Sequence, residues 1–276
     1  VPQYAVLGYG PLVHTYMPTL AFMNENSGFY PHRRRYFMNV MIYKKTGCIE
    51  LDKLRVIHLF EADFNLMVGI LFGHRAMHHN VDNKLLHLGQ YGRPGGECQD
   101  VAFAKTLHTH MATFSQTPIG QFESDAASCL DHIVLLFVFA LHSAWGAPVS
   151  ALRMWELALY HIVHSVKTAL GVSSSSYHYT PDTPVIGPGQ GSRGGPAACS
   201  IATSPLLTSM DQLSHGISFT DPTQQLHYSA CAKMFVDDNT NYSNRFLPWL
   251  HNPPHPHAVR DMIQHEPQNW ERPPCT

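Results

Sequence analysis

The sequence predicts an α+β protein, in which helices and mainly antiparallel strands follow one another irregularly along the chain. Two observations predict this class. Apolar residues recur at three- and four-residue spacing from Ala151 to Leu170, which is typical of a helix, and Gly171 follows where a helix would end. The segments Tyr228 to Phe235 and Thr240 to Phe246 flank a short Asp/Asn turn, which predicts the two arms of a hairpin.

The other predicted elements are short and are separated by Gly- and Pro-rich segments. β-Branched residues favour a strand from Arg55 to Phe60, and a short buried strand is expected from Phe122 to Asp125. Further helices are expected at Asn65 to His79, at Val101 to Ala112 with Asp100 opening it, at Ser128 to Trp145, and, more weakly, at Ala197 to Leu207. Residues 90–96 have the composition of a turn, and residues 173–176 and 181–196 have that of a linker.

The composition limits the class of protein. The 276 residues can form one large or two small domains, and 44% of them are hydrophobic, which is enough for an ample core. The net charge of −2 shows no overall excess of positive charge that would mark a nucleic-acid partner. Six scattered cysteines without a C-x-x-C pair favour reduced thiols in an intracellular protein, nuclear or cytoplasmic. No membrane segment is expected, because the longest apolar run, Ile133 to Leu141, is about half a bilayer span.

Adjacent carboxylates stand in the turn between the two hairpin arms. Asp237 and Asp238 follow the apolar Phe235 and Val236, and holding two carboxylates side by side is costly unless a cation compensates their repulsion. Phosphoryl transfer by two divalent ions needs carboxylates from separate chain segments, and Asp125 is the obvious third ligand. Taken alone, such a pair more often belongs to a solvated turn.

Five short motifs, two of which contain these carboxylates, follow one another along the sequence. They are a strand carrying Arg55, a Q-x-G-R-P-G segment at Gln90 to Gly95 with Asp100 behind it, D-A-x-x-x-x-D at Asp125 to Asp131, G-x-G-Q-G-S at Gly187 to Ser192, and F-V-D-D at Phe235 to Asp238. Together they cover about residues 44–244, and in this order the chain resembles reverse transcriptases of the non-long-terminal-repeat retrotransposon and group II intron type. Each segment alone is weak or moderate evidence, whereas five in order are strong.

The resemblance implies a right-hand polymerase fold. It implies a fingers-like region over residues 1–118, a palm with an antiparallel sheet over residues 119–247, and a Pro/His-rich, irregular tail over residues 248–276. Only 38 residues follow Asp238, so the thumb is expected to be largely absent from this chain. The chain begins Val-Pro-Gln, and we expect it to be an excerpt of a protein with adjoining element domains.

The resemblance also implies roles for particular residues. Asp125 and Asp237 would be the principal ligands of Mg²⁺ or Mn²⁺, with Asp238 in support. The incoming deoxynucleoside triphosphate would meet a second group, namely Arg55, Lys53, Leu130, Gln190 and Gly191. An RNA or DNA template with its primer would meet Gly92, Arg93 and Phe235. The implied activity is RNA-directed DNA synthesis, in which a primer 3′-hydroxyl attacks the α-phosphate and pyrophosphate leaves.

One residue departs from the family pattern at the sugar pocket. Leu130 stands where these enzymes usually carry a Phe or Tyr that blocks a ribose 2′-hydroxyl, which predicts reduced selection of deoxynucleotides. Together with the short tail, this departure predicts a poor polymerase. A first alternative is therefore a catalytically decayed, nucleic-acid-binding remnant of the same fold.

A second alternative comes from the 20 histidines of the chain. They suggest a His-rich metal-binding or interaction protein, but His161 and His164 stand without an H-E-x-x-H motif or a cysteine at ligand spacing. Surface or structural histidine is the simpler interpretation. A serine hydrolase is disfavoured, since the sequence contains no G-x-S-x-G motif.

Overall fold

The computed structural model describes residues 27–28, 30–31, 35–44, 50, 54–117, 119–126, 129–180, 182, 185–213, 216–220, 223–225, 227–236 and 238–243. The chain divides into two compact units, each built from two chain segments. Unit 1 comprises Val1–Asp82 and Leu130–Ala198, and unit 2 comprises Asn83–Cys129 and Cys199–Thr276. The units cut across the continuous ranges predicted as 1–118 and 119–247, because distant segments pair within each unit. The predicted tail, 248–276, lies outside the described residues.

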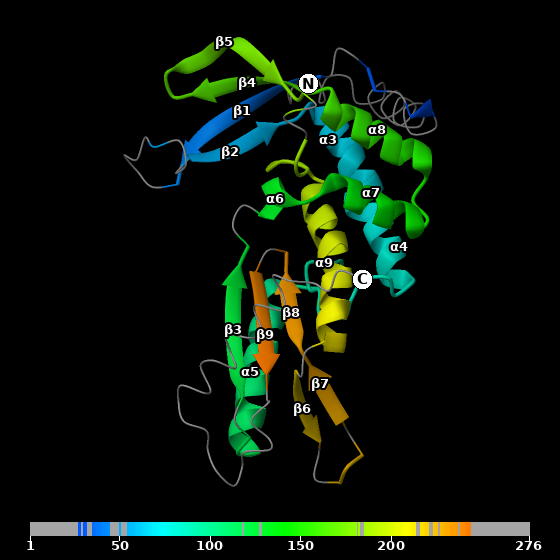
Figure 1. Ribbon diagram of the computed structural model, residues 1–276, viewed down its shortest axis with the longest axis vertical. Coiled ribbons are helices and arrows are strands. Elements are labelled where there is room, and N and C mark those ends of the chain that lie inside the picture. The colour runs from blue at the N-terminus through cyan, green and yellow to red at the C-terminus, as the bar shows by residue number, and fades with distance from the viewer. Residues whose placement is uncertain are drawn as a thin grey trace, which may run out of the picture. The chain divides into compact units, whose positions relative to one another are not determined.

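Unit 1 contains a four-stranded sheet with the strand order β2-β1-β4-β5 (Figure 1). The strands are β1 Tyr36–Tyr43, β2 Leu54–Leu59, β4 Val163–Thr168 and β5 Gly171–His178. Strand β1 is antiparallel to β2 and parallel to β4, and β4 and β5 form an antiparallel hairpin. The strand predicted at residues 55–60 is thus confirmed as β2, at the edge of this sheet.

The long helix predicted from Ala151 to Leu170 is wrong in its second half. Helix α8 covers only Val149–Tyr160, and the chain then turns into β4 and β5. Residues 162–166 include the β-branched Ile162, Val163 and Val166, which fit a strand as well as a helix face. The parallel pairing of β4 with β1 decides between the two, and sequence periodicity does not show that pairing. The serines at 173–176, predicted as linker, form part of β5.

The remaining helices of unit 1 pack around a buried aromatic cluster. They are α3 Ala62–Val68, the π-helical η3 Gly69–Ala76, α4 Met77–Asp82, α7 Leu135–Ala144 and α8, while the short α6 Cys129–His132 begins at the unit boundary. The Trp155 ring is fully buried, with ring centroids at 4.3 Å from Phe72 and 5.5 Å from Phe139. This cluster places Trp155 in the core of unit 1.

The helix predicted from Ser128 to Trp145 is interrupted between α6 and α7. The interruption falls at Ile133 and Val134, where Val134 has an extended backbone. The Ile133 carbonyl accepts a hydrogen bond of 2.9 Å from the Gly187 backbone N–H. A contact with a loop more than 50 residues away therefore takes up a carbonyl that a continuous helix would have used.

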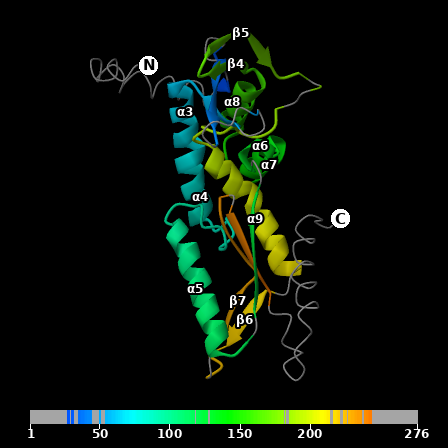
Figure 2. The ribbon, with the colours of Figure 1, turned by 90° about the vertical axis from the view of Figure 1, so that its left-hand side faces the viewer.

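Unit 2 contains a three-stranded antiparallel sheet with the strand order β3-β9-β8, and a separate hairpin, β6-β7. The strands are β3 Gly120–Asp125, β6 Ile217–Thr220, β7 His227–Ala230, β8 Ala232–Phe235 and β9 Asp238–Ser243. Helix α5 Cys98–Phe114 lies along the sheet in both ribbon views (Figure 1 and Figure 2). Most of helix α9 Gly195–Leu213 also belongs to this unit, where Leu207 and Met210 pack on Ala232 and Met234 of β8.

The hairpin predicted around the carboxylate pair is present but shorter than expected. Strand β8 starts at Ala232, because the preceding residues pair with β6 as β7 instead of continuing the same arm. The strand predicted at 122–125 and the helices predicted at 65–79, 101–112 and 197–207 are confirmed within β3, α3 to α4, α5 and α9. The α+β class is therefore confirmed. Among the described residues, no helix combines the length and apolar character that a membrane span requires.

Candidate active site

The predicted carboxylates meet on adjacent strands of unit 2. In the antiparallel pairing of β3 with β9, Asp125 is the direct partner of Asp238. Residues opposite each other in such a pair have Cβ atoms about 4.5–5.5 Å apart, and their side chains point to the same face. Both side chains are exposed. Two carboxylates from segments more than 100 residues apart therefore share one patch of the surface.

The carboxylate patch suits a divalent cation by its chemistry. Like charges directly opposite on a sheet are destabilising, and Mg²⁺ prefers carboxylate oxygens as protein ligands. Asp237, the third carboxylate of the predicted set, lies outside the described residues, as does Lys53. Within the part of the chain that is described, no three His, Cys, Asp or Glu side chains form a metal-binding group. The described geometry thus supplies two of the three predicted ligands.

A strained residue lies between β8 and β9, shortly before Asp238. Phe235 pairs with Asp238 across the hairpin, and Val236 beside it has φ +56°. A β-branched residue in this left-handed region is a genuine outlier, which persists only where the surroundings enforce it. The Val236 carbonyl accepts a hydrogen bond of 3.0 Å from the Cys199 thiol at the start of the unit 2 part of α9. Strain of this kind clusters at functional sites.

The Q-x-G-R-P-G segment lies beside this turn. Tyr91 N–H donates to the Met234 carbonyl at 2.7 Å, and Met234 N–H donates to the Gly89 carbonyl at 2.8 Å, so the segment extends the sheet at the outer edge of β8. A Cβ on Gly92 would lie 3.0 Å from the Val236 nitrogen. Gly92 is thus placed against the carboxylate turn, with the half-buried Arg93 next to it.

Three residues that were not predicted as site residues hold this segment in place. Gln90 is fully buried, and its side chain donates to Thr203 at 2.7 Å and accepts from Gly92 N–H at 2.8 Å. Ser200 donates from its hydroxyl to the Gly92 carbonyl at 2.7 Å. Together with Cys199, these residues link α9 to both the Gly92 segment and the turn. The only sequence signal for these contacts is a run of small residues, 197–204, after the glycine-rich loop at 187–192. Such a run does not show which segments it contacts.

A buried lysine stands on the same sheet face as the carboxylates. Lys233 is two positions before Phe235 on β8, its ammonium donates to the Tyr91 hydroxyl at 3.2 Å, and it lies 5.3 Å from the centroid of the Tyr91 ring. A cation over an aromatic face is stabilised by the ring quadrupole. The lysine therefore ties the Q-x-G-R-P-G segment to the sheet through Tyr91.

The predicted nucleotide-binding loop is built into unit 1. Gln190 carbonyl accepts a hydrogen bond of 2.7 Å from His58 N–H on β2, and its side chain donates to Asp131 at 3.2 Å. Gly191 has φ +109°, and a Cβ there would lie 2.4 Å from the His58 carbonyl oxygen. Burial lowers the pKa of the His58 imidazole, while Asp131 opposes that shift. Residues 190–191 are therefore fixed against the edge strand of the four-stranded sheet.

Leu130 and Arg55 also lie in unit 1. The Leu130 backbone carbonyl faces Gly187 so closely that a Cβ there would lie 2.0 Å from it. Arg55 is exposed on β2, three residues before His58, which puts it on the opposite face of that strand. The predicted site residues thus fall into two groups. Unit 2 holds Asp125, Asp238, Phe235, Gly92 and Arg93, and unit 1 holds Arg55, Leu130, Gln190 and Gly191.

We expect Gly191→Ala to destabilise unit 1 by about 2–3 kcal/mol, because the new methyl group meets the His58 carbonyl in a backbone conformation that alanine rarely adopts. Urea unfolding followed by tryptophan fluorescence measures the change. Gly171→Ala is the matched control, since Gly171 has φ +137° with open space around it. Equal losses for the two variants would show that the contact with His58 contributes nothing beyond the backbone conformation.

Sequence comparisons identify no relative of this chain, and a structural comparison gives a distant similarity. No family model matches the sequence, and no curated protein matches it. One similar solved structure is an apo telomerase from Candida tropicalis truncated from its C-terminal domain, with 10% sequence identity and a TM-score of 0.49. The match covers 88% of this chain and 47% of that one, so the chain spans about half the length of that protein.

Proposed function

We propose that this chain is the core of an RNA-directed DNA polymerase of the mobile-element type, which extends a primer by template-dependent nucleotidyl transfer. The observation that carries the proposal is the direct opposition of Asp125 and Asp238 beside the strained turn at Val236. Carboxylates gathered from distant segments are what two-ion phosphoryl transfer requires. The five ordered sequence segments support the same chemistry.

In the proposed mechanism, residues of unit 2 bind the metal ions and contact the template and primer. Asp125 and Asp238, with Asp237, would hold Mg²⁺ or Mn²⁺, which when bound activates the primer hydroxyl and steadies the leaving oxygen. The strained Val236 would help to hold Asp238 in place before substrate arrives, so that little reorganisation is needed during the reaction. Gly92 and Arg93 would contact the template and primer backbone next to the turn.

The residues of unit 1 would bind the incoming deoxynucleoside triphosphate. Arg55 presents an always-charged guanidinium suited to phosphate, and the loop at Gln190 and Gly191 would lie against the nascent base pair. Leu130 would lie against the sugar.

Single-nucleotide extension by the full 276-residue chain tests the function. We expect template-directed addition of a deoxynucleotide to a primer in Mg²⁺ or Mn²⁺, abolished by chelation of the metal. Binding of the template and primer without extension in either metal would instead identify a decayed remnant. Stoichiometric zinc uptake without nucleotide dependence would identify a metal-binding protein of another class.

We expect Arg55→Ala to raise the KM for the deoxynucleotide about tenfold or more, because a charge-assisted contact to phosphate is lost. The Kd for the template and primer should change much less. Steady-state extension and duplex titration measure the two quantities on the same preparation, with the exposed Arg153→Gln as the control. An equal loss in both would identify Arg55 as a general backbone contact.

A further inference from the structure

Two cysteine thiols lie in contact within unit 2. The sulfur atoms of Cys129 and Cys199 are 3.4 Å apart, although the two residues stand 70 positions apart in the sequence. The sulfur atoms of a disulfide are about 2.05 Å apart, so this pair needs to approach by about 1.4 Å. Rotation of the two short side chains covers such a distance. The geometry therefore suits formation of a disulfide.

The two cysteines bound the segment of chain that belongs to unit 1. Cys129 is the last residue of the unit 2 segment Asn83–Cys129, and Cys199 is the first residue of the unit 2 segment Cys199–Thr276. The chain between them, Leu130–Ala198, is the whole second segment of unit 1. A disulfide would close a covalent loop around that segment. Closing a loop of this length restricts the unfolded chain, so oxidation should stabilise the folded protein.

The thiol of Cys199 also bonds with the backbone shortly before Asp238. Its sulfur donates to the Val236 carbonyl at 3.0 Å, since a carbonyl can only accept. Val236 has φ +56°, a conformation that persists only where the surroundings enforce it. A disulfide has no S–H group, so oxidation of Cys199 removes this hydrogen bond. The oxidation state of the pair therefore affects one of the contacts that hold Val236.

The two thiols differ in their access to an oxidant. Cys129 is half-buried at the start of α6, whereas Cys199 is 0% exposed in α9. Cysteines that respond to oxidants are accessible and often stand beside a second cysteine that resolves the first oxidation product. Exposure thus gives Cys129 the role of the thiol that is attacked first, and contact gives Cys199 the role of the resolving thiol.

We propose that Cys129 and Cys199 form a reversible disulfide when the protein meets hydrogen peroxide. The Cys129 thiolate attacks one peroxide oxygen, the O–O bond breaks, and a sulfenic acid and a water molecule form. The Cys199 sulfur then attacks the sulfenic sulfur, the S–O bond breaks, and a second water leaves with the Cys199 proton. Two thiols are oxidised and one peroxide is reduced. A dithiol restores both thiols by disulfide exchange.

The consequence for primer extension rests on the proposed polymerase function. Without the hydrogen bond from Cys199, the backbone at Val236 is held less firmly next to Asp238. We expect the oxidised chain to extend a primer about fivefold more slowly, which corresponds to the loss of one neutral hydrogen bond. Dithiothreitol should restore the rate. The disulfide would then act as a redox switch on the carboxylate site.

Peptide mapping of the full chain tests the disulfide and needs no activity. The chain is treated with a small excess of hydrogen peroxide, the remaining thiols are alkylated, and the protein is digested without reductant at sites that separate Cys199 from Cys231. We expect a linked pair of peptides that contain Cys129 and Cys199 and that dithiothreitol separates. Cys98→Ser, at an exposed position of α5, is the control and should give the same pair. A Cys129 that is unchanged, oxidised beyond sulfenic acid, or linked to a different cysteine would overturn the proposal.

Urea unfolding gives a second readout that is independent of activity. Oxidation should raise the urea midpoint of the parent chain by about 1 M, because the closed loop restricts the unfolded state. Cys129→Ser cannot form the link, so peroxide should not raise its midpoint. This variant also controls for oxidation of methionine, which dithiothreitol does not reverse. An equal rise in the parent and in Cys129→Ser would show that the stabilisation does not come from the disulfide.

Variants separate the disulfide from its effect on extension. Cys129→Ser keeps the Cys199 thiol, so its extension should equal that of the reduced parent and resist peroxide. Cys199→Ala lacks the bond to Val236 from the start, and its extension should be about fivefold slower with or without peroxide. A mapped disulfide that leaves extension unchanged would overturn the switch. A reduced parent chain without any extension would count against the proposed polymerase function, whereas peptide mapping would still decide the disulfide.

Discussion

Replacing Asp125 with Asn is expected to lower template-directed extension by at least about 1,000-fold, about 4 kcal/mol in activation free energy. The change removes the charge of a proposed metal ligand at nearly constant volume, so it should affect metal binding and not packing. Asp237→Asn should have an effect of similar size. Asp238→Asn should have a smaller one, because the role proposed for Asp238 is a supporting one. Single-turnover extension at saturating nucleotide measures each rate.

The same variants have a readout that does not depend on activity. Removing one of two directly opposed carboxylates relieves like-charge repulsion, so Asp125→Asn should keep or slightly raise the melting temperature in the absence of metal. Addition of Mg²⁺ should raise the melting temperature of the parent chain more than that of the variant, since a ligand that binds only the folded state stabilises it.

Glu123→Gln is the matched control for the carboxylate variants. Glu123 points to the same face of β3 two residues before Asp125, and its carboxylate is engaged with Lys105 at 2.9 Å. Extension should therefore survive this change. Retained extension in Asp125→Asn, or an equal loss in Glu123→Gln, would show that the opposed carboxylates are not the catalytic site.

Acidification from pH 7.5 to pH 4.5 is expected to unfold the protein at temperatures where it is stable at neutral pH. Burial lowers the pKa of His108, His142 and His164 to about 4 each, with the Lys233 charge adding to the shift at His108. Histidine in an unfolded chain has a pKa near 6.5. Between these values the unfolded state binds more protons, so the contribution of these residues is fully present above pH 6.5 and is lost as the pH falls toward 4.

The size of this effect follows from the number of protons taken up. Each histidine that is neutral when folded and protonated when unfolded gives a slope of about 1.4 kcal/mol per pH unit, so the three together give up to about 4 kcal/mol per pH unit near pH 5. Urea unfolding at pH steps from 4 to 8 measures the slope. The free energy lost over one pH unit is therefore a large fraction of the free energy of unfolding of a typical domain, which is about 5–15 kcal/mol.

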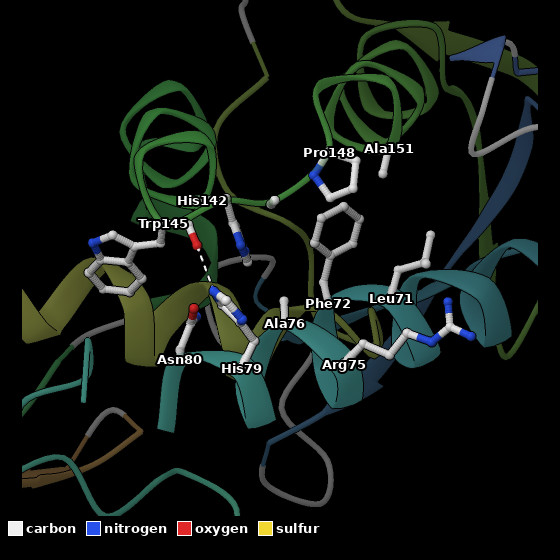
Figure 3. A pocket seen from close by; sticks show the side chains of 12 residues that line it. Leu71, Phe72, Arg75, Ala76, His79, Asn80, His142, Trp145, Pro148 and Ala151 are labelled. Carbon is white, nitrogen blue, oxygen red and sulfur yellow. Dashed lines mark hydrogen bonds between the residues drawn. The ribbon is translucent and has the colours of Figure 1, made fainter. Parts of the chain in front are cut away.

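Replacing one buried histidine should flatten the profile by about one third. His142→Phe, in the lining of a pocket in unit 1 (Figure 3), is the best choice, because His142 Nε2 makes no hydrogen bond to the described residues and the ring shape is nearly conserved. His110→Phe, at an exposed position of α5, is the control and should leave the slope unchanged. A profile of His142→Phe as steep as that of the parent chain would show that this residue is not neutral in the folded state.

The positions of the carboxylate hairpin and its partner strand could be predicted from local sequence. Asp125 ends β3 and Asp238 begins β9, close to where the flanking residues predict a strand end and a hairpin turn. Helix α5 and the segment from α3 to α4 were likewise predictable, because uninterrupted helical residues are followed by clear turn signals. Local propensity and tertiary structure agree in these segments.

Other elements depended on contacts between distant residues. Residues 163–168 have a pattern compatible with a helix, yet they pair with β1, which lies more than 120 residues earlier in the chain. The predicted helix 128–145 is interrupted at Ile133, whose carbonyl bonds with Gly187. The first predicted hairpin arm is shortened at its start, because β7 pairs with β6. Hydrogen bonds between strands carry no periodic signal in either strand alone, so single-sequence patterns cannot choose among them.

The sequence by itself determined the residue types of the site: three carboxylates, a glycine-rich loop and an arginine-bearing strand in a fixed order. Only the tertiary structure decided that Asp125 faces Asp238, and that hydrogen bonds of Gln90, Cys199 and Ser200 link α9 to the Gly92 segment and to Val236. The physical reason is that motif chemistry is encoded in single residues and short spacings. Register, burial and hydrogen-bond partners are instead set by the lowest free energy of the whole folded chain.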